Sequence, residues 1–181
     1  MNVFTICKKF FPAVSLICLF ALNARAQVIF DGNKNIITIG NAIGYYIDSS
    51  SSQNIQSIQQ QKHFVKNTAN VPDFGLLKVP IWLKISINNK STAQNLMIKF
   101  DQSLLLSIEF YYYDHGKYTV NQAGELYPFN SRTINYHKFV YDLKIPPDST
   151  VTYYARIKSS HEMQMPVFLG KKDSIEDDKP C

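Results

Sequence analysis

Short runs in which apolar and polar residues alternate recur along most of this chain. In residues 79–91, VPIWLKISINNKS, four apolar residues share one parity: Ile81, Leu83, Ile85 and Ile87. Successive side chains of a β-strand point to opposite faces, so this run predicts a strand with one face in the core. The only tryptophan, Trp82, lies on the polar parity. Two alternatives follow for it: a stacking surface for a ligand on an exposed sheet face, or a side chain packed beneath a loop.

The same alternation predicts further short strands at residues 35–39, 43–47, 96–100, 107–113, 118–120, 137–145, 151–158 and 166–169. Turn residues separate these runs, as in Asp114-His115-Gly116-Lys117. Long helical patterns do not alternate with the strands, which argues against a parallel α/β fold, and no internal repeat indicates a propeller or solenoid. The sequence therefore predicts an all-β fold, an antiparallel β-sandwich or jelly roll.

One short helix is expected near residues 53–60, within the polar run that begins at Asp48. Ile55 and Ile58 form a thin apolar stripe at helical spacing, and the preceding serines are suitable helix caps. The alternative is a flexible linker, which four consecutive serines would suit.

The N-terminal residues 1–26 have the pattern of a secretory signal peptide. Lys8 and Lys9 precede an apolar run at 10–22, and Ala24-Arg25-Ala26 supplies small residues at the cleavage positions. The alternative is an uncleaved N-terminal anchor, although the run is shorter than the roughly 20 apolar residues of a membrane span. We therefore expect an exported β-sandwich domain at residues 27–170, followed by a disordered or linker tail at 171–181.

Removal of the signal peptide changes what charge and cysteines imply. The formal charge of the whole chain is +5, and loss of Lys8, Lys9 and Arg25 lowers it to +2. No cluster of basic residues remains that would follow a phosphate backbone, so nucleic acid is not an expected partner. Of the three cysteines only Cys181 remains, so an internal disulfide is excluded and the core alone must stabilise the domain.

Five segments occur in an order that resembles a known family: IGYYIDSSSS, DFGLLKVPIWLKISINNKS, IEFYYYDHGKY, GELYPFNSRTINYHKFVYDLKIPP and VTYYARIKSSHEMQMPVFL. They resemble the larger, jelly-roll type of extracellular sensor domain (7TMR-DISM extracellular domain 2) of bacterial seven-transmembrane receptors with diverse intracellular signalling modules. The resemblance spans roughly residues 39–169.

The resemblance implies a β-sandwich similar to carbohydrate-binding modules. It also implies a position in the periplasm or on the extracellular face of the cytoplasmic membrane, where the domain passes a ligand signal to a membrane-embedded helical bundle. No apolar stretch follows Gly170. We therefore expect a chain without its transmembrane and output modules: a receptor fragment, a truncated product or a free exported binding domain.

Candidate ligand contacts come from the polar parities of the strands and from one loop: Trp82, Lys84, Arg132, His137 and Arg156. Aromatic faces stack on sugar rings, and guanidinium groups hold carboxylates or hydroxyls in fixed geometry. If the strands that carry Trp82 and Arg156 are neighbours, these side chains would form one aromatic and basic groove. The ligand that this groove predicts is a small carbohydrate or a carboxylated metabolite.

No motif indicates an enzyme, a metal or a cofactor. The spacing of Asp31, Asn33 and Asn35 is that of a calcium loop, but Ile36 stands where the loop needs glycine and Ala42 where it needs a bidentate acid. The four histidines are scattered, and the carboxylates show no pair typical of a glycosidase. We therefore expect a non-catalytic binding domain. The alternatives are an exported protein-interaction or structural module and a hydrolase with unrecognised carboxylates.

Overall fold

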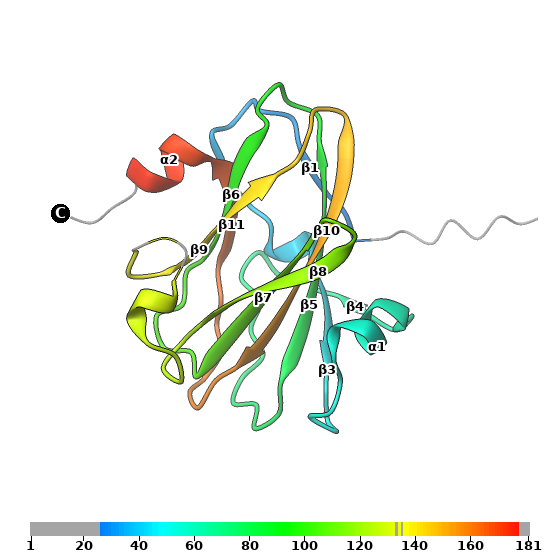
Figure 1. The fold of residues 1–181 in the computed structure, drawn as a ribbon, viewed down its shortest axis with the longest axis vertical. Coiled ribbons are helices and arrows are strands. Elements are labelled where there is room, and N and C mark those ends of the chain that lie inside the picture. Colours follow the sequence, from blue (N-terminus) through cyan, green and yellow to red (C-terminus); the bar gives the residue numbers. More distant parts are fainter. Residues whose placement is uncertain (1–25, 133, 135, 178–181) are drawn as a thin grey trace, which may run out of the picture.

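The computed structural model of the protein describes residues 26–132, 134 and 136–177, and it contains two β-sheets packed face to face (Figure 1). The larger sheet has the strand order β4(Val65–Lys66)-β3(Gly44–Ile47)-β5(Ile81–Asn89)-β10(Ser149–Lys158)-β7(Ser107–Asp114)-β8(Lys117–Ala123), and β1(Val28–Phe30) pairs with β5. The smaller sheet has the order β2(Ile36–Thr38)-β11(Val167–Lys171)-β6(Asn95–Phe100)-β9(Phe139–Lys144). Within the described residues only the β1–β5 pair is parallel, so the predicted antiparallel β-sandwich is confirmed. The predicted signal peptide lies outside the described residues except for Ala26.

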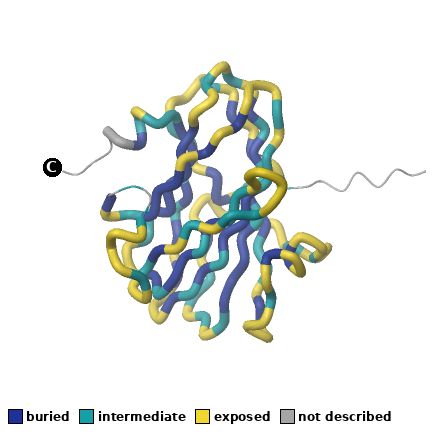
Figure 2. Tube along the Cα trace, viewed as in Figure 1, coloured by how far each residue is buried: buried dark blue, intermediate teal, exposed yellow. Residues whose placement is uncertain are grey.

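The core lies between the two sheets, and the alternating parities fill it as predicted. All four apolar residues of one parity of β5 are fully buried: Ile81, Leu83, Ile85 and Ile87. Leu96, Ile98 and Phe100 of β6 face them from the smaller sheet. Figure 2 shows that the buried residues are concentrated in the strands, whereas the connections at the two ends of the sandwich are largely exposed.

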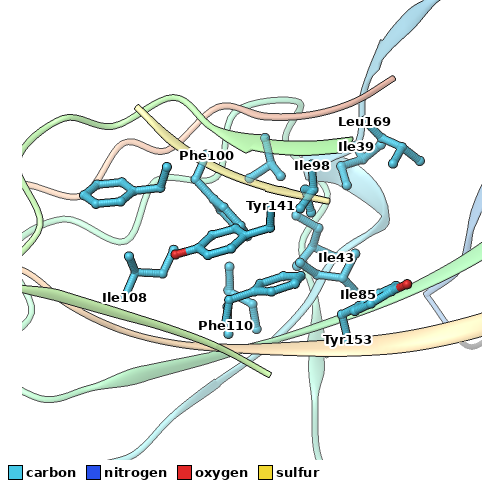
Figure 3. Close-up of a cluster of buried hydrophobic side chains, with 14 of the residues drawn as sticks. Ile39, Ile43, Ile85, Ile98, Phe100, Ile108, Phe110, Tyr141, Tyr153 and Leu169 are labelled. Atoms are coloured by element: carbon cyan, nitrogen blue, oxygen red, sulfur yellow. The ribbon is translucent and has the colours of Figure 1, made fainter. Parts of the chain in front are cut away.

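A layer of aromatic rings joins the two sheets near the centre of the core. Phe110 of β7 stacks on Tyr141 of β9 with ring centroids 4.4 Å apart, and on Tyr153 of β10 at 5.6 Å (Figure 3). Burial raises the pKa of both tyrosines above the ordinary value, because the charged phenolate loses its hydration there. These rings contribute large apolar areas to the core, in a described part of the chain that contains no cysteine.

A tight hairpin connects β7 to β8, as the composition of residues 114–117 predicts. Its two central residues, His115 and Gly116, both have positive φ angles, 45° and 82°. Asp114 and Lys117 are paired on either side of them, so the connection is a two-residue turn of type I′. The strand β8 that follows is longer than predicted, because it continues to Ala123 instead of ending at Val120.

The predicted helix near residues 53–60 is present as α1 (Ile55–Gln60). Its N-cap is Asn54 and not one of the preceding serines: the Asn54 side chain accepts from the Ser57 N–H at 3.0 Å, and the Ser57 hydroxyl accepts from the Asn54 N–H at 3.1 Å. Ile55 and Ile58 are buried, as the apolar stripe predicts. Because both residues are buried, the segment packs as a helix and is not the flexible linker of the alternative.

The expected disordered or linker tail at 171–181 requires a correction. Lys171 is the last residue of β11, and a short helix, α2, occupies Lys172–Asp177. Ile175 is 1% exposed and packs with Met97, Tyr136 and Val140 on the outer face of the smaller sheet. One apolar residue among charged neighbours is a weak pattern, which is why the charged composition alone suggested a tail. Residues 178–181 lie outside the described part of the chain.

Two shorter single-turn helices lie in the connections: η1 (Gly40–Ala42) between β2 and β3, and η2 (Phe129–Ser131) between β8 and β9. The second belongs to the long connection that carries two of the predicted site residues, Arg132 and His137. Its position beside β8 brings that connection to the edge of the larger sheet.

Candidate functional site

The outer face of the larger sheet, which points away from the smaller sheet, carries one continuous row of polar and aromatic side chains. Strand register places Tyr46, Trp82, Arg156, Glu109 and Gln122 side by side on β3, β5, β10, β7 and β8. The strands that carry Trp82 and Arg156 are therefore direct neighbours. This satisfies the condition under which the sequence predicts one groove.

Trp82 is fully buried in this row, with no exposed surface. It packs with Ile55 and Ile58 of α1 and with Tyr154, and its ring centroid lies 5.4 Å from that of Tyr111. Of the two alternatives for this residue, the structure corresponds to the packed side chain, with α1 in the place of the covering loop. The indole face is therefore not a surface on which a sugar ring can stack in this structure.

Arg156 forms the charged centre of the row. Its Nη1 lies 3.2 Å from Oε1 of Glu109, and both side chains are largely buried, at 15% and 14% exposure. The Tyr111 hydroxyl donates to Oε2 of Glu109 at 2.7 Å, so both carboxylate oxygens have a partner. The second guanidinium nitrogen, Nη2, donates to the Ser51 carbonyl at 3.4 Å, a long and therefore weak hydrogen bond.

The pKa values of nearby tyrosines respond to this ion pair. Burial raises the pKa of Tyr111 above its ordinary value, and the hydrogen bond to Glu109 and its negative charge raise it further. The pKa of Tyr127 is raised by burial first and then by Glu109, whereas Arg156 lowers it. Both phenols therefore stay protonated at neutral pH and can act as hydrogen-bond donors.

Two buried donors in this row make no hydrogen bond to any described residue: Nε1 of Trp82 and Nε of Arg156. The two residues are cross-strand partners on the same face of the sheet. A buried donor without an acceptor costs about 1–3 kcal/mol, so such groups need an explanation. One of these two donors belongs to the Arg156 guanidinium and the other to the residue paired with it, so this position is the strongest candidate for contact with a ligand oxygen.

Lys84 extends the same face by one row. It pairs with Tyr154 of β10, two residues from Arg156, so the two cations are diagonal neighbours across β5 and β10. Its Nζ lies 5.5 Å from the centre of the Phe64 ring. Phe64 also contacts Tyr154, with ring centroids 6.3 Å apart, so the lysine lies beside an aromatic cluster.

Arg132 and His137 lie in a different environment, in the connection between β8 and β9. The guanidinium of Arg132 lies between the rings of Phe129 and Phe139, 4.6 Å from each, and donates to the carbonyls of Tyr136 and Lys138 at 2.6 and 3.4 Å. Burial lowers the pKa of Arg132 below its ordinary value. His137 is exposed, and its ring packs on Tyr136. These contacts of Arg132 and His137 are local, so Arg132 orders this connection and does not extend the row around Arg156.

A depression of about 220 Å³, open to solvent, lies next to Arg132 between the edge strands of the two sheets. Its lining residues are Asn121, Gln122, Ala123, Arg132, Ile134, Lys138, Phe139, Val140 and Tyr141. Only about 10 Å³ of it can hold the centre of a water-sized molecule, far less than the roughly 300–1,000 Å³ of ordinary small-molecule pockets. In the described part of the chain, no group of three or more His, Cys, Asp or Glu residues is arranged to hold a metal ion.

Glu109 of this row, and Tyr111 two residues further along the same strand, were not singled out by the sequence as ligand contacts. Both lie on the polar parity of β7, opposite Ile108, Phe110 and Tyr112. A carboxylate within a strongly apolar strand is the signal that would have identified Glu109. Its partner, Arg156, lies 47 positions away in the sequence, so only the strand pairing connects them.

The sequence comparisons give one family. A sequence model of the family 7TMR-DISM extracellular 2 matches residues 40–171, from the start of η1 to the end of β11. None of the curated proteins is significantly similar to the chain. Among the described residues, no helix has the length and apolar character needed to cross a membrane.

Proposed function

Because this chain belongs to the 7TMR-DISM extracellular 2 family, the extracellular sensor domains of seven-transmembrane receptors, we propose that it binds a small ligand outside the cytoplasmic membrane. The ligand is a small carbohydrate or a carboxylated metabolite. The binding event is non-catalytic, and the domain passes it to a membrane-embedded helical bundle. The site is the row around Arg156 on the outer face of the larger sheet.

The observation that carries this proposal is the unsatisfied donor on the largely buried Arg156 guanidinium. A guanidinium presents five N–H donors in a fixed plane, which suits the paired oxygens of a carboxylate or of neighbouring sugar hydroxyls. Glu109 occupies part of this donor set, and its negative charge orients the group. A ligand oxygen would complete the set, and Lys84 would add a second cation on the same face.

The weak contact of the segment that covers Arg156 supports entry of the ligand at this point. Ser51 supplies only a long contact to Nη2 and has a positive φ of 56°, an unfavourable conformation for a residue with a side chain. A ligand oxygen at this nitrogen would replace the Ser51 carbonyl and release that conformation. We therefore propose that the exposed serine segment before α1 moves when the ligand binds.

The role proposed for Glu109 is to orient Arg156, not to transfer a proton. Both its oxygens are occupied, by Arg156 and by the Tyr111 hydroxyl. General acid catalysis by a carboxyl group requires a proton on an oxygen that reaches the substrate. These two contacts favour binding over the hydrolase alternative.

A thermal-shift screen of the purified protein against monosaccharides, disaccharides and organic acids tests the proposal. A ligand present at 100 times its Kd stabilises the folded state by about 2.7 kcal/mol, which raises Tm by roughly 5–10 °C in a domain of this size. The double variant Glu109→Gln, Arg156→Gln removes the ion pair without leaving a buried charge unpaired. It should fold and lose the shift.

Lys84→Gln should weaken the same shift, whereas the matched control Lys144→Gln, an exposed lysine on the smaller sheet, should keep it. If the double variant gives the same shift as the unmodified protein, the site is not the row around Arg156. If neither sugars nor organic acids change Tm, the proposed ligand class is wrong.

A further inference from the structure

Strand β8 forms one edge of the larger sheet, and its outer side has no strand partner in the described part of the chain. An edge strand presents main-chain N–H and C=O groups that can pair with another chain. Natural proteins usually protect such an edge with charges, proline, bulges or a covering segment. The charges and prolines of β8, and any segment that covers its outer side, therefore decide whether this edge is protected.

The type I′ turn determines which groups of β8 point outward. In a two-residue hairpin the flanking pair, Asp114 and Lys117, exchanges hydrogen bonds, and the bonded and non-bonded pairs then alternate along the ladder. Tyr118, Val120 and Gln122 occupy the non-bonded positions, so their N–H and C=O groups point away from β7. An independent contact agrees with this assignment, because the Ser131 hydroxyl donates to the Gln122 carbonyl at 3.0 Å from outside the sheet.

The same contact divides the edge into a covered and an open part. Ser131 belongs to η2, which lies beside β8 at the Gln122 end. Towards the turn, no described residue hydrogen bonds to the outward main-chain groups of Tyr118 and Val120. The open edge is therefore the short segment between the turn and Asn121.

This open segment lacks the usual protection. Lys117, at the turn, is the only charged residue of β8, and the strand contains no proline. Two apolar side chains beside the edge are exposed on the outer face: Tyr113 at 60% and Val120 at 37%. A strand added here would cover both of them.

We propose that the open edge of β8 pairs with the β8 edge of a second copy of this chain, antiparallel, with Thr119 opposite the second copy's Thr119. In this register Tyr118 lies opposite the second copy's Val120, and the two pairs form four main-chain hydrogen bonds. Lys117 lies opposite an asparagine, so no like charges face each other. Registers centred closer to Gln122 bring the second copy against η2.

The two copies form one continuous sheet, and their Tyr113, Tyr118 and Val120 side chains meet on its outer face. The paired segment is short, and the buried area falls below the roughly 800 Å² per partner of a standard stable interface. The dimer is therefore weak for the free domain. Two copies held close together on a membrane would have a high effective concentration and pair more completely.

Disulfide crosslinking tests the register. In the full chain with Cys7, Cys18 and Cys181 replaced by serine, Thr119→Cys places two cysteines in a non-bonded antiparallel pair, with Cα atoms about 4.5 Å apart, within disulfide range. The matched control Asn121→Cys places them roughly 13 Å apart, because each strand advances 3.4 Å per residue. Thr119→Cys should form at least tenfold more covalent dimer under mild oxidation.

Sedimentation at high protein concentration tests the edge without a covalent bond. Val120→Lys introduces a positive charge in each copy, and in the proposed register the two charges are diagonal neighbours across the paired strands. This variant should therefore raise the dimer Kd at least tenfold, whereas Val71→Lys, at an exposed valine in a loop, should leave it unchanged. Circular dichroism checks that both variants fold. The proposal is overturned if Thr119→Cys crosslinks no better than Asn121→Cys or if Val120→Lys dimerises normally. Crosslinking of Thr119→Cys to a different protein, without homodimer, also overturns it.

Discussion

At the scale of single residues, Trp82 illustrates how parity and burial can diverge. The alternation in β5 correctly places Trp82 on the face opposite Ile81, Leu83 and Ile85. That face is also covered here, because α1 lays Ile55 and Ile58 over the indole ring. A polar parity therefore indicates the outer face of a sheet, and only the packing of other elements decides whether that face meets solvent.

The first prediction concerns the packing of this ring. Trp82→Ala removes the largest fully buried side chain and should lower the free energy of unfolding by about 3–5 kcal/mol, because a cavity remains beneath α1. Leu76→Ala, at an exposed loop position, should change it by less than about 0.5 kcal/mol. Urea denaturation followed by circular dichroism measures both. A cost below 1 kcal/mol for Trp82→Ala would contradict the packed ring.

At the scale of secondary-structure elements, the local chemistry of caps and turns determines where the elements begin and end. Asn54 and Ser57 form a reciprocal capping box that starts α1. His115 and Gly116 adopt positive φ angles, which the twist of the β7–β8 hairpin requires. The sequence predicted α1 from its apolar stripe and the hairpin from its turn residues, which are local signals, although it assigned the cap to the preceding serines and not to Asn54. It missed α2, which depends on the contact of Ile175 with the distant Met97.

The second prediction concerns the cap of α1. Asn54→Ala removes the acceptor for the Ser57 N–H and should destabilise the protein by about 1 kcal/mol, whereas Asn54→Ser should retain most of the stability. Trp82 is the only tryptophan and lies under α1, so its fluorescence reports local opening of the helix. Acrylamide should quench it more strongly in Asn54→Ala. Equal quenching in all three proteins would show that the cap does not hold the helix over the ring.

At the scale of the whole molecule, the sandwich is held together by its core. The central layer is rich in tyrosine, and several of these phenols are buried. On the outer face of the larger sheet, in the cluster with Trp82, burial raises the pKa of Tyr154 to about 12, with a smaller increase from Tyr118, and raises that of Tyr118 as well. The folded state therefore retains phenolic protons that the unfolded chain releases near pH 10.

The third prediction follows from this difference. Because the pKa is raised on folding, the contribution of Tyr154 is fully present below pH 10 and is lost as the pH rises towards 12. The free energy of unfolding should fall in this range by at most about 1.4 kcal/mol per pH unit for each such tyrosine. Urea denaturation at several alkaline pH values measures it. Tyr154→Phe should reduce the slope, and an unchanged slope would exclude Tyr154 as a source.

The candidate site was only partly predictable from the sequence. Lys84 and Arg156 lie on the parity that the alternation assigns to the outer face, and strand pairing brings them together. Arg132 and His137 belong to the same connection but have local contacts, with Phe129, Phe139 and Tyr136. The position of a side chain in a loop depends on how that loop packs. The spacing of residues in the sequence does not predict this packing.

The sequence by itself determined the antiparallel sandwich, most of its strands, the helix near residues 53–60 and the membership of the family. These features depend on period-two alternation, turn residues and the order of segments, all of which are local properties of the chain. Only the tertiary structure decided that α1 buries Trp82, that Arg156 forms an ion pair with Glu109, and that β8 is an edge strand with an open side. The physical reason is that each of these depends on which strands pair and what covers them, and such contacts join residues far apart in the sequence.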